Sequence, residues 1–162
     1  ALTLGMDVHS NVESLSFVVN QSGAEIPIVF IQNPITKFPI PLPVPDVSLA
    51  NPPLGLIPPM PKSVKLMKET AKLSPIAALG KGLAAAAGSS ADAVTGDGSL
   101  DVLRYGHVLK ARQLVGVRGA GLSFDGLYYV KKVSSKLKAG EFKQSFSLAR
   151  NGLISTLPLV PA

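Results

Sequence analysis

The sequence contains no cysteine, so disulfide bonds and thiolate metal sites are excluded. Histidine is also scarce, because His9 and His107 are the two histidines of the chain. The GxSxG and HExxH patterns are missing, and no other pattern pairs a nucleophile with a base. The carboxylates of Asp97, Asp101 and Asp125 lie where turn or cap residues are expected. We therefore expect no catalytic residue, no metal and no cofactor.

Long apolar runs are missing as well. A transmembrane helix needs ~20 apolar residues, and proline interrupts the most apolar part of this chain repeatedly. The sequence begins at Ala1 without a basic segment followed by an apolar one, so no signal peptide is predicted. We expect no membrane insertion by this chain. From the missing initiator methionine we expect either N-terminal processing or, preferably, a fragment of a longer protein.

Charge is unevenly distributed along the chain. The formal net charge is +6, and residues 101–150 hold ten basic residues against three acidic ones. Such a segment could attract nucleic acid, anionic lipid or an acidic protein surface. The lysines alternate with apolar positions, and no aromatic stacking motif is interleaved with them. We therefore favour a solvated strand face and expect no nucleic-acid partner.

Proline is concentrated in one part of the chain. Eleven of the fourteen prolines fall between Pro27 and Pro61, and proline alternates with an apolar residue from Pro39 to Pro45. This alternation predicts a stiff, extended segment that cannot be a central strand. Two interpretations stay open: a ligand for a proline-reading domain, or an arm that docks on a neighbouring subunit. For the arm we predict subunit contacts through four apolar residues: Phe38, Ile40, Leu42 and Val44.

Periodicity predicts several further elements. Alternation over 12–20 and a β-branched run over 26–31 indicate strands. The spacing of apolar residues over 63–73 predicts an amphipathic helix, and Ser74-Pro75 is typical of the start of a second helix through residue 87. Residues 88–99 are small and polar, which predicts a flexible loop. Residues 100–110 fit either a short helix or a strand.

The stretch from Leu114 to Gly152 predicts a three-stranded antiparallel meander. Asp125-Gly126 is typical of a two-residue hairpin turn, and Gly140 predicts the second reversal. Period-two alternation in the last strand places apolar side chains on one face. The predicted meander core consists of Tyr129, Val133, Phe142, Phe146 and Leu148.

The run GLSFDGLYYVKKVSSKLKAGEFKQSFSLARNGL resembles the C-terminal signature of the phage late control gene D family. These are the tail-hub proteins of contractile phage tails and related injection systems. The family pattern is approximately DGLYYV, a Val-x-x-Val strand and then G-E-[YF]-K-Q-S-F-x-L-x-R-x-G. Many relatives carry histidine where this chain has Ser135, so no role of that histidine is carried over.

The resemblance implies a structural baseplate hub that joins the central spike to the inner tube. It implies a homotrimer that contacts spike, inner tube and baseplate proteins, is cytoplasmic during assembly, and ends as a component of a phage tail or tail-like particle. The alternative is an independent binding or adaptor module that recruits a partner through its proline-rich segment.

Together these observations predict a mainly β fold with a helical insertion. The meander would belong to a tail-hub-type β-barrel, accompanied by the proline-rich arm and a helical hairpin. The predicted divisions are strands leading from a preceding barrel (1–33), the arm (34–61), the helical hairpin and loop (62–99), and the meander with a C-terminal tail (100–162).

Overall fold

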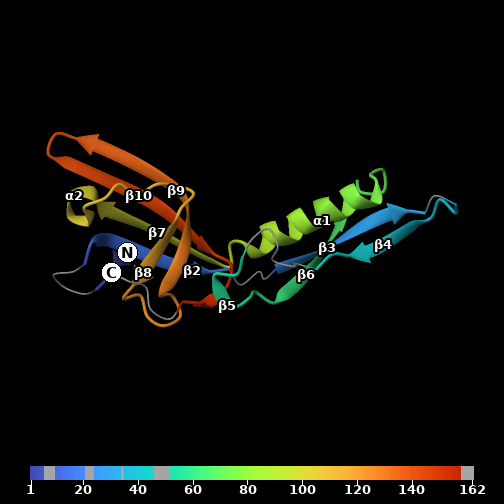
Figure 1. Ribbon diagram of the computed structural model, residues 1–162, viewed down its shortest axis with the longest axis horizontal. Coiled ribbons are helices and arrows are strands. Elements are labelled where there is room, and N and C mark those ends of the chain that lie inside the picture. The colour runs from blue at the N-terminus through green and yellow to red at the C-terminus, as the bar shows by residue number, and fades with distance from the viewer. Residues whose placement is uncertain (6–9, 21–23, 34, 46–51, 158–162) are drawn as a thin grey trace. The chain divides into compact units, whose positions relative to one another are not determined.

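The computed structural model describes residues 1–5, 10–20, 24–33, 35–45 and 52–157 (Figure 1). The protein is mainly β, as predicted. It forms two compact units that are interleaved along the chain. Unit 1 comprises Ala1–Asn20, Pro53–Pro58 and Asp92–Ala162, and unit 2 comprises Gln21–Pro52 and Pro59–Ala91. The units therefore do not follow the four consecutive segments expected from the sequence.

Unit 1 is built on a curled six-stranded sheet with the order β1-β8-β9-β10-β7-β2 (Figure 1). All neighbouring pairs are antiparallel except β1 with β8, which is parallel. A short sheet of β5 and β11 and the one-turn helix α2 complete the unit. The bounds are β1 Leu2–Thr3, β2 Val12–Val19, β5 Gly55–Ile57, β7 Val94–Asp101, α2 Val102–Tyr105, β8 Leu114–Arg118, β9 Gly126–Lys138, β10 Glu141–Arg150 and β11 Leu153–Ser155.

Asn11 links the two edge strands of this sheet. It directly precedes β2, and its backbone N–H donates to the carbonyl oxygen of Thr3 in β1 at 3.2 Å. Its side-chain oxygen accepts from the Thr3 N–H at 2.8 Å, and its side-chain nitrogen donates to the Ala1 carbonyl at 2.9 Å. These bonds hold edge β1 beside the start of edge β2 in the curled sheet.

The concave face of the sheet carries the apolar core. Phe17 of β2 stacks on Phe124 with 5.0 Å between ring centroids and lies 5.4 Å from the ring of Tyr128. Further buried residues complete the core: Leu2, Val12, Val94, Leu100, Val102, Leu109, Val115, Val117, Val130, Phe146 and Leu148. Because β-strand side chains alternate between faces, the opposite face of the same strands is polar.

The meander of β8, β9 and β10 is present, and the reversal at Gly140, which has a φ of 79°, is confirmed. The two-residue turn predicted at Asp125-Gly126 is wrong. Residues 119–125 connect β8 to β9, and the N–H groups of Phe124 and Asp125 both donate to the carbonyl of Gly121. Gly126 instead begins β9 with a φ of 128°, and a Cβ there would lie 2.1 Å from that of Ser155. Glycine is required at this position for close packing as well as for its backbone angle.

The flexible loop predicted over 88–99 is also wrong in most of its length. The helix α1 (Pro75–Ser90) includes the first residues of this segment, and β7 starts at Val94 and pairs with β10 on one side and β2 on the other. Residues 100–110 are partly strand and partly helix: β7 ends at Asp101, whose carboxylate accepts from the Leu103 N–H and caps α2.

In its described residues, unit 2 has a three-stranded sheet with the order β4-β3-β6 and the helix α1. β3 pairs antiparallel with β4 and parallel with β6. α1 begins as predicted, with Ser74 as the N-cap that accepts from the Ala77 N–H and Pro75 in the first turn. The bounds are β3 Ala24–Gln32, β4 Pro39–Pro43, β6 Pro61–Met67 and α1 Pro75–Ser90.

α1 packs closely on one face of this sheet. A Cβ added at Gly82 would lie 2.8 Å from a methyl carbon of Val44 and 2.9 Å from one of Val29, so glycine lets the helix approach the sheet. The Ser89 hydroxyl exchanges hydrogen bonds with the N–H and the carbonyl of Glu25. The face that carries Val29 and Val44 is therefore the covered face of the sheet.

The helical hairpin is not formed, because its first half is the strand β6. Residues 61–67 pair with β3 over the whole length of β6. The sequence of this segment alternates with period two at Val64 and Leu66 as well as with helical spacing. For such an ambiguous pattern, hydrogen bonding to a neighbouring strand overrides local helix propensity.

Candidate functional site

The first polar cluster surrounds Arg150, which is 1% exposed at the end of β10. Its three side-chain nitrogens donate to three backbone carbonyls: Ser123 at 2.6 Å, Gly152 at 2.8 Å and Asp125 at 2.9 Å. Its guanidinium carbon lies 4.6 Å from the centre of the Tyr128 ring. Burial lowers the pKa of Arg150 from its ordinary value, and the nearby Tyr128 and Asp125 oppose this.

The residues that follow Arg150 are equally engaged. The Asn151 side-chain oxygen accepts from the Leu54 N–H at 2.8 Å. A Cβ added at Gly152 would lie 2.7 Å from the Ile57 carbonyl oxygen, so only glycine lets β5 approach this closely. The sequence Arg-Asn-Gly thus holds β5, the 119–125 connection and the end of β10 together.

Tyr128 occupies the core position that was expected for Tyr129. Tyr128 is fully buried, whereas Tyr129 is 41% exposed. The Tyr128 hydroxyl donates to the Phe124 carbonyl at 2.8 Å, and burial raises the pKa of Tyr128 to about 12. The difference arises because the register of β9 with β10 shifts between Ser147 and Leu148, so strict alternation does not hold along the whole pair. Of the other predicted core residues, Phe146 and Leu148 are buried, and Val133 and Phe142 pack against the core.

A second polar cluster centres on Gln144, which is 1% exposed. Its side-chain oxygen accepts from the Leu109 N–H at 2.9 Å, and its nitrogen donates to the Leu109 carbonyl at 3.2 Å. The same nitrogen donates to the Ser135 hydroxyl at 2.9 Å. The amide therefore pairs with the backbone of Leu109 as a neighbouring strand would. Sequence reasoning missed Arg150 and Gln144, although both stand in the motif GEFKQSFSLARNG as polar residues on the apolar face of β10.

The convex face of the sheet carries serines in register across four strands. Ser14, Ser99, Ser145 and Ser134 are successive partners in β2, β7, β10 and β9. We call this row, with the adjacent row defined next, the serine face. The adjacent row consists of Ser16, Asp97, Ser147 and Lys132.

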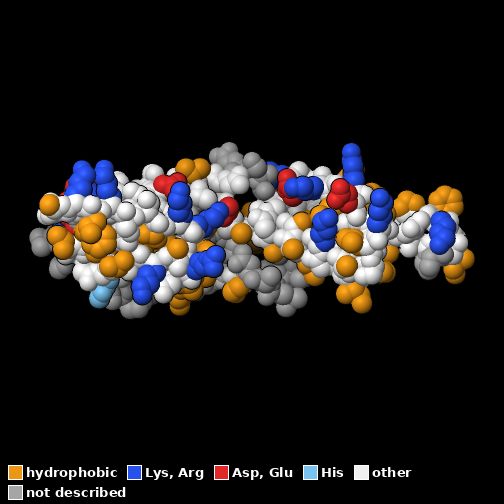
Figure 2. Space-filling view, turned by 90° about the horizontal axis from the view of Figure 1, so that it is seen from above, with side chains coloured by type: hydrophobic (Ala, Val, Ile, Leu, Met, Phe, Trp, Pro, Cys, Tyr) orange, Lys and Arg blue, Asp and Glu red, His pale blue; other side chains and the backbone are white. Residues whose placement is uncertain are grey.

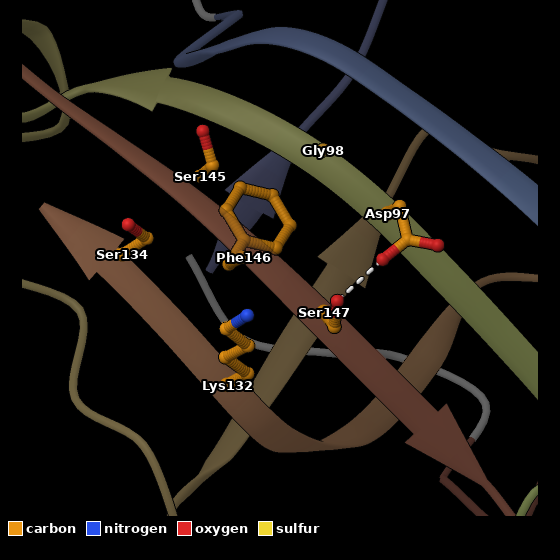
Figure 3. Close-up of a pocket in the computed structure, with 7 residues that line it drawn as sticks. All are labelled: Asp97, Gly98, Lys132, Ser134, Ser145, Phe146 and Ser147. Atoms are coloured by element: carbon orange, nitrogen blue, oxygen red, sulfur yellow. Dashed lines mark hydrogen bonds between the residues drawn. The ribbon is translucent and has the colours of Figure 1, made fainter.

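Figure 3 shows the centre of the serine face, where Ser147 donates to the Asp97 carboxylate. The hollow between these side chains is about 190 Å³ and has Lys132 at one side. Small-molecule sites typically have roughly 300 Å³ or more and are mostly apolar. A neighbouring hollow that shares Asp97, Lys132 and Ser147 is about 320 Å³, but both hollows are open to solvent, so the serine face is better suited to contact a broad surface than to enclose a small ligand.

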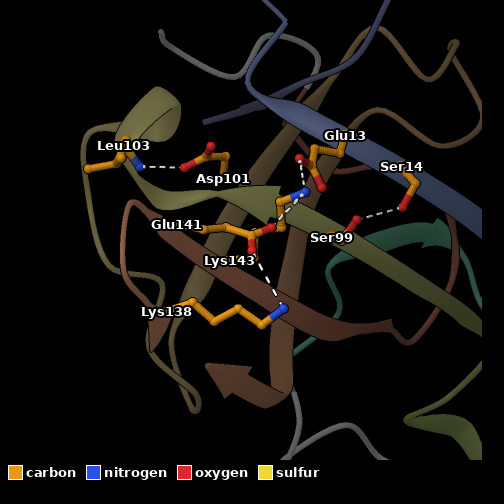
Figure 4. A network of polar contacts seen from close by, with 8 residues as sticks. All are labelled: Glu13, Ser14, Ser99, Asp101, Leu103, Lys138, Glu141 and Lys143. Atoms are coloured by element: carbon orange, nitrogen blue, oxygen red, sulfur yellow. Dashed lines mark hydrogen bonds and ion pairs between the residues drawn. The ribbon is translucent and has the colours of Figure 1, made fainter. Parts of the chain in front are cut away.

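Charges at one end of the serine face are paired (Figure 4). The Lys143 ammonium lies 2.9 Å from a Glu13 oxygen and 3.3 Å from a Glu141 oxygen. The hydrogen bond to Glu13, followed by that to Glu141, raises the pKa of Lys143. Lys138 lies 3.9 Å from Glu141, and the Ser14 and Ser99 hydroxyls are 2.8 Å apart.

Basic side chains are also spread among apolar ones over the surface seen in Figure 2.

A larger hollow of unit 1, about 540 Å³, lies beside the Arg150 cluster. Its apolar wall is open to solvent, since Leu122 is 92% and Leu56 64% exposed. Among the described lining residues the acidic one is Asp125, whose carboxylate already accepts from the Ala120 N–H at 2.7 Å. The remaining lining residues are Ser123, Ile154, Ser155, Thr156 and Leu157. The described lining offers apolar contact and hydroxyls but no acid–base pair.

The two histidines do not form a site in the described part of the chain. His107 is exposed and contacts Tyr105 edge to face, with 6.1 Å between ring centroids. His9 lies outside the described residues. Within those residues, no three His, Asp or Glu side chains are grouped as metal ligands would be, and no helix is long and apolar enough to cross a membrane.

The proline-rich segment is an edge strand and not a free arm. Val44 N–H donates to the Pro27 carbonyl at 2.9 Å and Asn33 N–H donates to the Phe38 carbonyl at 3.0 Å, which fixes the register at both ends of β4. Residues 38, 40, 42 and 44 therefore turn their backbone groups toward β3. The three prolines, Pro39, Pro41 and Pro43, turn theirs outward, where proline has no N–H to leave unpaired. The alternation of proline matches the period of the strand.

This register also places the four predicted contact residues. Phe38 is 74%, Ile40 50% and Leu42 38% exposed. Val44 is 3% exposed because it packs against Gly82 of α1. Three of the four side chains are thus open to a partner, and Val44 is buried in the core of unit 2.

Comparisons with known proteins find a similarity in fold to solved structures. No protein-family model matches the chain, and no curated protein matches its sequence. The fold is similar to the crystal structure of the 43 kDa tail protein of prophage MuSo2 from Shewanella oneidensis, with a TM-score of 0.61 and 13% sequence identity. The similarity covers 93% of this chain and 44% of the tail protein, so the chain spans less than half of that protein's length. At this identity the similarity establishes a shared fold.

Proposed function

We propose that this chain is a structural component of a contractile phage tail or of a related injection particle. The observation that carries the proposal is the fold similarity to a prophage tail protein over 93% of the chain. The signature between Gly121 and Leu153 points the same way. Sequence and fold are separate observations, because the similarity in fold occurs at 13% identity.

Within such a particle, we propose that the chain belongs to the baseplate hub, forms a homotrimer, and joins the central spike to the inner tube. The roles of the signature residues support a scaffold of this kind. Arg150, Gly152 and Gln144 all hold backbone segments together in the interior of unit 1. A motif whose residues hold buried backbone segments together is expected in a protein that must maintain its shape and performs no reaction.

We assign a structural rather than a catalytic role to the chain. Among the described residues, every buried side-chain nitrogen or oxygen has a hydrogen-bond partner. Two strongly buried polar side chains, Arg150 and Gln144, donate to or accept from backbone groups. These side chains are committed to the fold, which supports assembly as the function.

The subunit contact of the proposed trimer includes Phe38, Ile40 and Leu42. Their exposed side chains are apolar and lie in or next to one edge strand. Exposed apolar side chains that gather in one place are typical of protein contacts. The contact does not extend to Val44, which is buried inside unit 2.

Light scattering on the purified chain tests this proposal. The expected mass is that of three 16.8 kDa chains. The double variant Phe38→Ser, Ile40→Ser should reduce the mass to that of one chain. The matched control Ile76→Ser changes a residue of α1 that is 85% exposed and should leave the trimer intact. A wild-type chain that stays monomeric up to the highest soluble concentration would contradict the trimer.

A further inference from the structure

The two edges of the unit 2 sheet are built differently. On the outer edge of β4, all three outward positions are prolines, so this edge offers carbonyl acceptors and no N–H donors. Proteins commonly place proline on edge strands to prevent pairing with other chains. The other edge of the same sheet is β6, in which Pro61 is the single proline and is followed by six residues that each carry an N–H.

The register between β3 and β6 shows which backbone N–H and C=O groups of β6 point away from the sheet. Ala24 N–H donates to the Met60 carbonyl at 3.2 Å and Phe30 N–H donates to the Thr70 hydroxyl at 2.7 Å, so even-numbered residues of β3 face β6. Ile26 is paired with Val64 and Ile28 with Leu66. In a parallel ladder, β3 then bonds to the backbone of residues 63, 65 and 67. Val64 and Leu66 point both their N–H and their C=O away from the sheet.

The side chains along this edge are apolar on one face and basic near its ends. Val64 is 58% and Leu66 56% exposed, and both lie on the face opposite α1, since their β3 partners alternate with Val29. Lys68 and Lys72 follow the strand and make no ion pair in the part of the chain that the structure describes. Lys65, on the α1 face, is 3.3 Å from Glu25.

We propose that the outer edge of β6 accepts an extended strand from a partner protein, in which apolar side chains alternate with acidic ones. The partner backbone would pair with the N–H and C=O groups of Val64 and Leu66, as in strand addition to an open sheet edge. Its apolar side chains would continue the row of Val64 and Leu66. Its acidic side chains would lie on the other face of the added strand, on the same side of the sheet as Lys65.

Charge favours a partner strand of another protein over a second copy of this edge. Unit 2 holds six lysines against three acidic residues. Two β6 edges paired with each other would bring lysines of the same strand together, which is unfavourable between neighbouring strands. Acidic side chains of a partner strand at the same positions would instead be attracted to these lysines. This inference stands on the geometry of unit 2 and does not depend on the proposed tail function.

The test uses the full chain and a fluorescent ten-residue peptide of alternating valine and glutamate, followed by fluorescence anisotropy. Saturable binding is expected, and a peptide of alternating valine and lysine should not bind. Val64→Pro removes one outward N–H and should weaken binding about tenfold or more, whereas Val64→Ala keeps that N–H and should bind within a few-fold of the wild type. No binding of the glutamate peptide, or equal binding by the Val64→Pro protein, would overturn the proposal.

Amide hydrogen exchange gives a second measurement that needs no variant. In the free protein the amides of Val64 and Leu66 should exchange fast, while that of Lys65, bonded to β3, should be protected. Adding the glutamate peptide should slow exchange at Val64 and Leu66 and leave exposed amides elsewhere unchanged. Binding without protection at these two amides would place the peptide at another surface and would refute the proposed edge.

Discussion

Arg150 connects three parts of unit 1 through a single buried side chain. It donates to carbonyls in the 119–125 connection and beyond the end of β10, and it stacks on Tyr128. A buried cation is costly unless its donors are satisfied, and here the acceptors are backbone oxygens held in place by the fold. The side chain therefore stabilises the fold only when these segments are correctly positioned relative to one another.

Arg150→Met tests this role. The substitution keeps an apolar stem but leaves the carbonyls of Ser123, Asp125 and Gly152 without their donor. Hydrogen bonds to a charged group each contribute about 1.5–3 kcal/mol and three are lost, so we expect the free energy of unfolding to fall by about 3 kcal/mol or more in urea titration. Arg104→Met is the control, because Arg104 is exposed in α2 and its loss should change stability by under about 0.5 kcal/mol. Equal effects of the two substitutions would refute the assignment.

Tyr128 predicts a pH dependence of stability in alkaline solution. Burial raises its pKa from 10 to about 12. Between these values the unfolded chain loses the phenol proton while the folded chain keeps it, so stability falls as pH rises from about 10 to about 12. Urea titrations across this range should show a steeper fall for the wild type than for Tyr128→Phe, which cannot ionise. Parallel curves for both proteins would show that Tyr128 is not buried in its neutral form.

At the residue scale, the sequence predicted the apolar face of β10 but not the polar groups within it. Phe146 and Leu148 follow from period-two alternation. Arg150 and Gln144 occupy the same face, and their partners are backbone groups distant in sequence, which no local pattern indicates. Tyr129 was preferred to Tyr128 because alternation cannot reveal a register shift set by the neighbouring strand.

At the scale of single elements, β7 shows why a glycine-rich segment can be a central strand. The rings of Phe17 and Phe146 fill the space next to Gly96 and Gly98. A Cβ at Gly96 would lie 2.9 Å from the Phe17 ring, and a Cβ at Gly98 would lie 2.8 Å from the Phe146 ring. Glycine in a strand often marks such a close approach of neighbouring groups. Small polar residues alone predicted a loop, since the rings come from other strands.

Two glycine-to-alanine substitutions should therefore have opposite effects. In Gly98→Ala the new Cβ would lie 2.5 Å from the Ser14 backbone oxygen, so β2 has to move, and we expect destabilisation by about 1–3 kcal/mol. In Gly80→Ala the new methyl group has open space within α1, and we expect stabilisation by about 0.5–1 kcal/mol. Urea titration of both variants measures the two changes. Tolerance of alanine at Gly98 would contradict the packing of β7.

The elements predicted correctly are those with strong local signals. The helix that begins at Ser74-Pro75 and the reversal at Gly140 depend on nearby residues. The prediction of a helix over 63–73 was wrong because the apolar pattern fits both the helix and the strand period. Pairing with β3 selects the strand. The prediction of a two-residue turn at Asp125-Gly126 was wrong because glycine is required at position 126 by close contact with Ser155, a residue from a distant part of the sequence.

At the scale of the whole molecule, the chain leaves unit 1 and returns to it twice. Pro53–Pro58 rejoins unit 1 between two segments of unit 2 and contributes β5, which pairs with β11. Domain prediction from composition places boundaries between consecutive segments, and interleaving of this kind depends on contacts far apart in sequence. The mainly β class was predictable because strand signals dominate both ends of the chain.

The most direct test of the tail proposal is electron microscopy of tail particles from cells that encode the chain, labelled with an antibody raised against it. The account predicts gold label confined to one end of each particle, where the baseplate lies. It also predicts recovery of the chain by mass spectrometry from particles purified to constant composition. Intact particles that carry neither the label nor the chain would contradict the account.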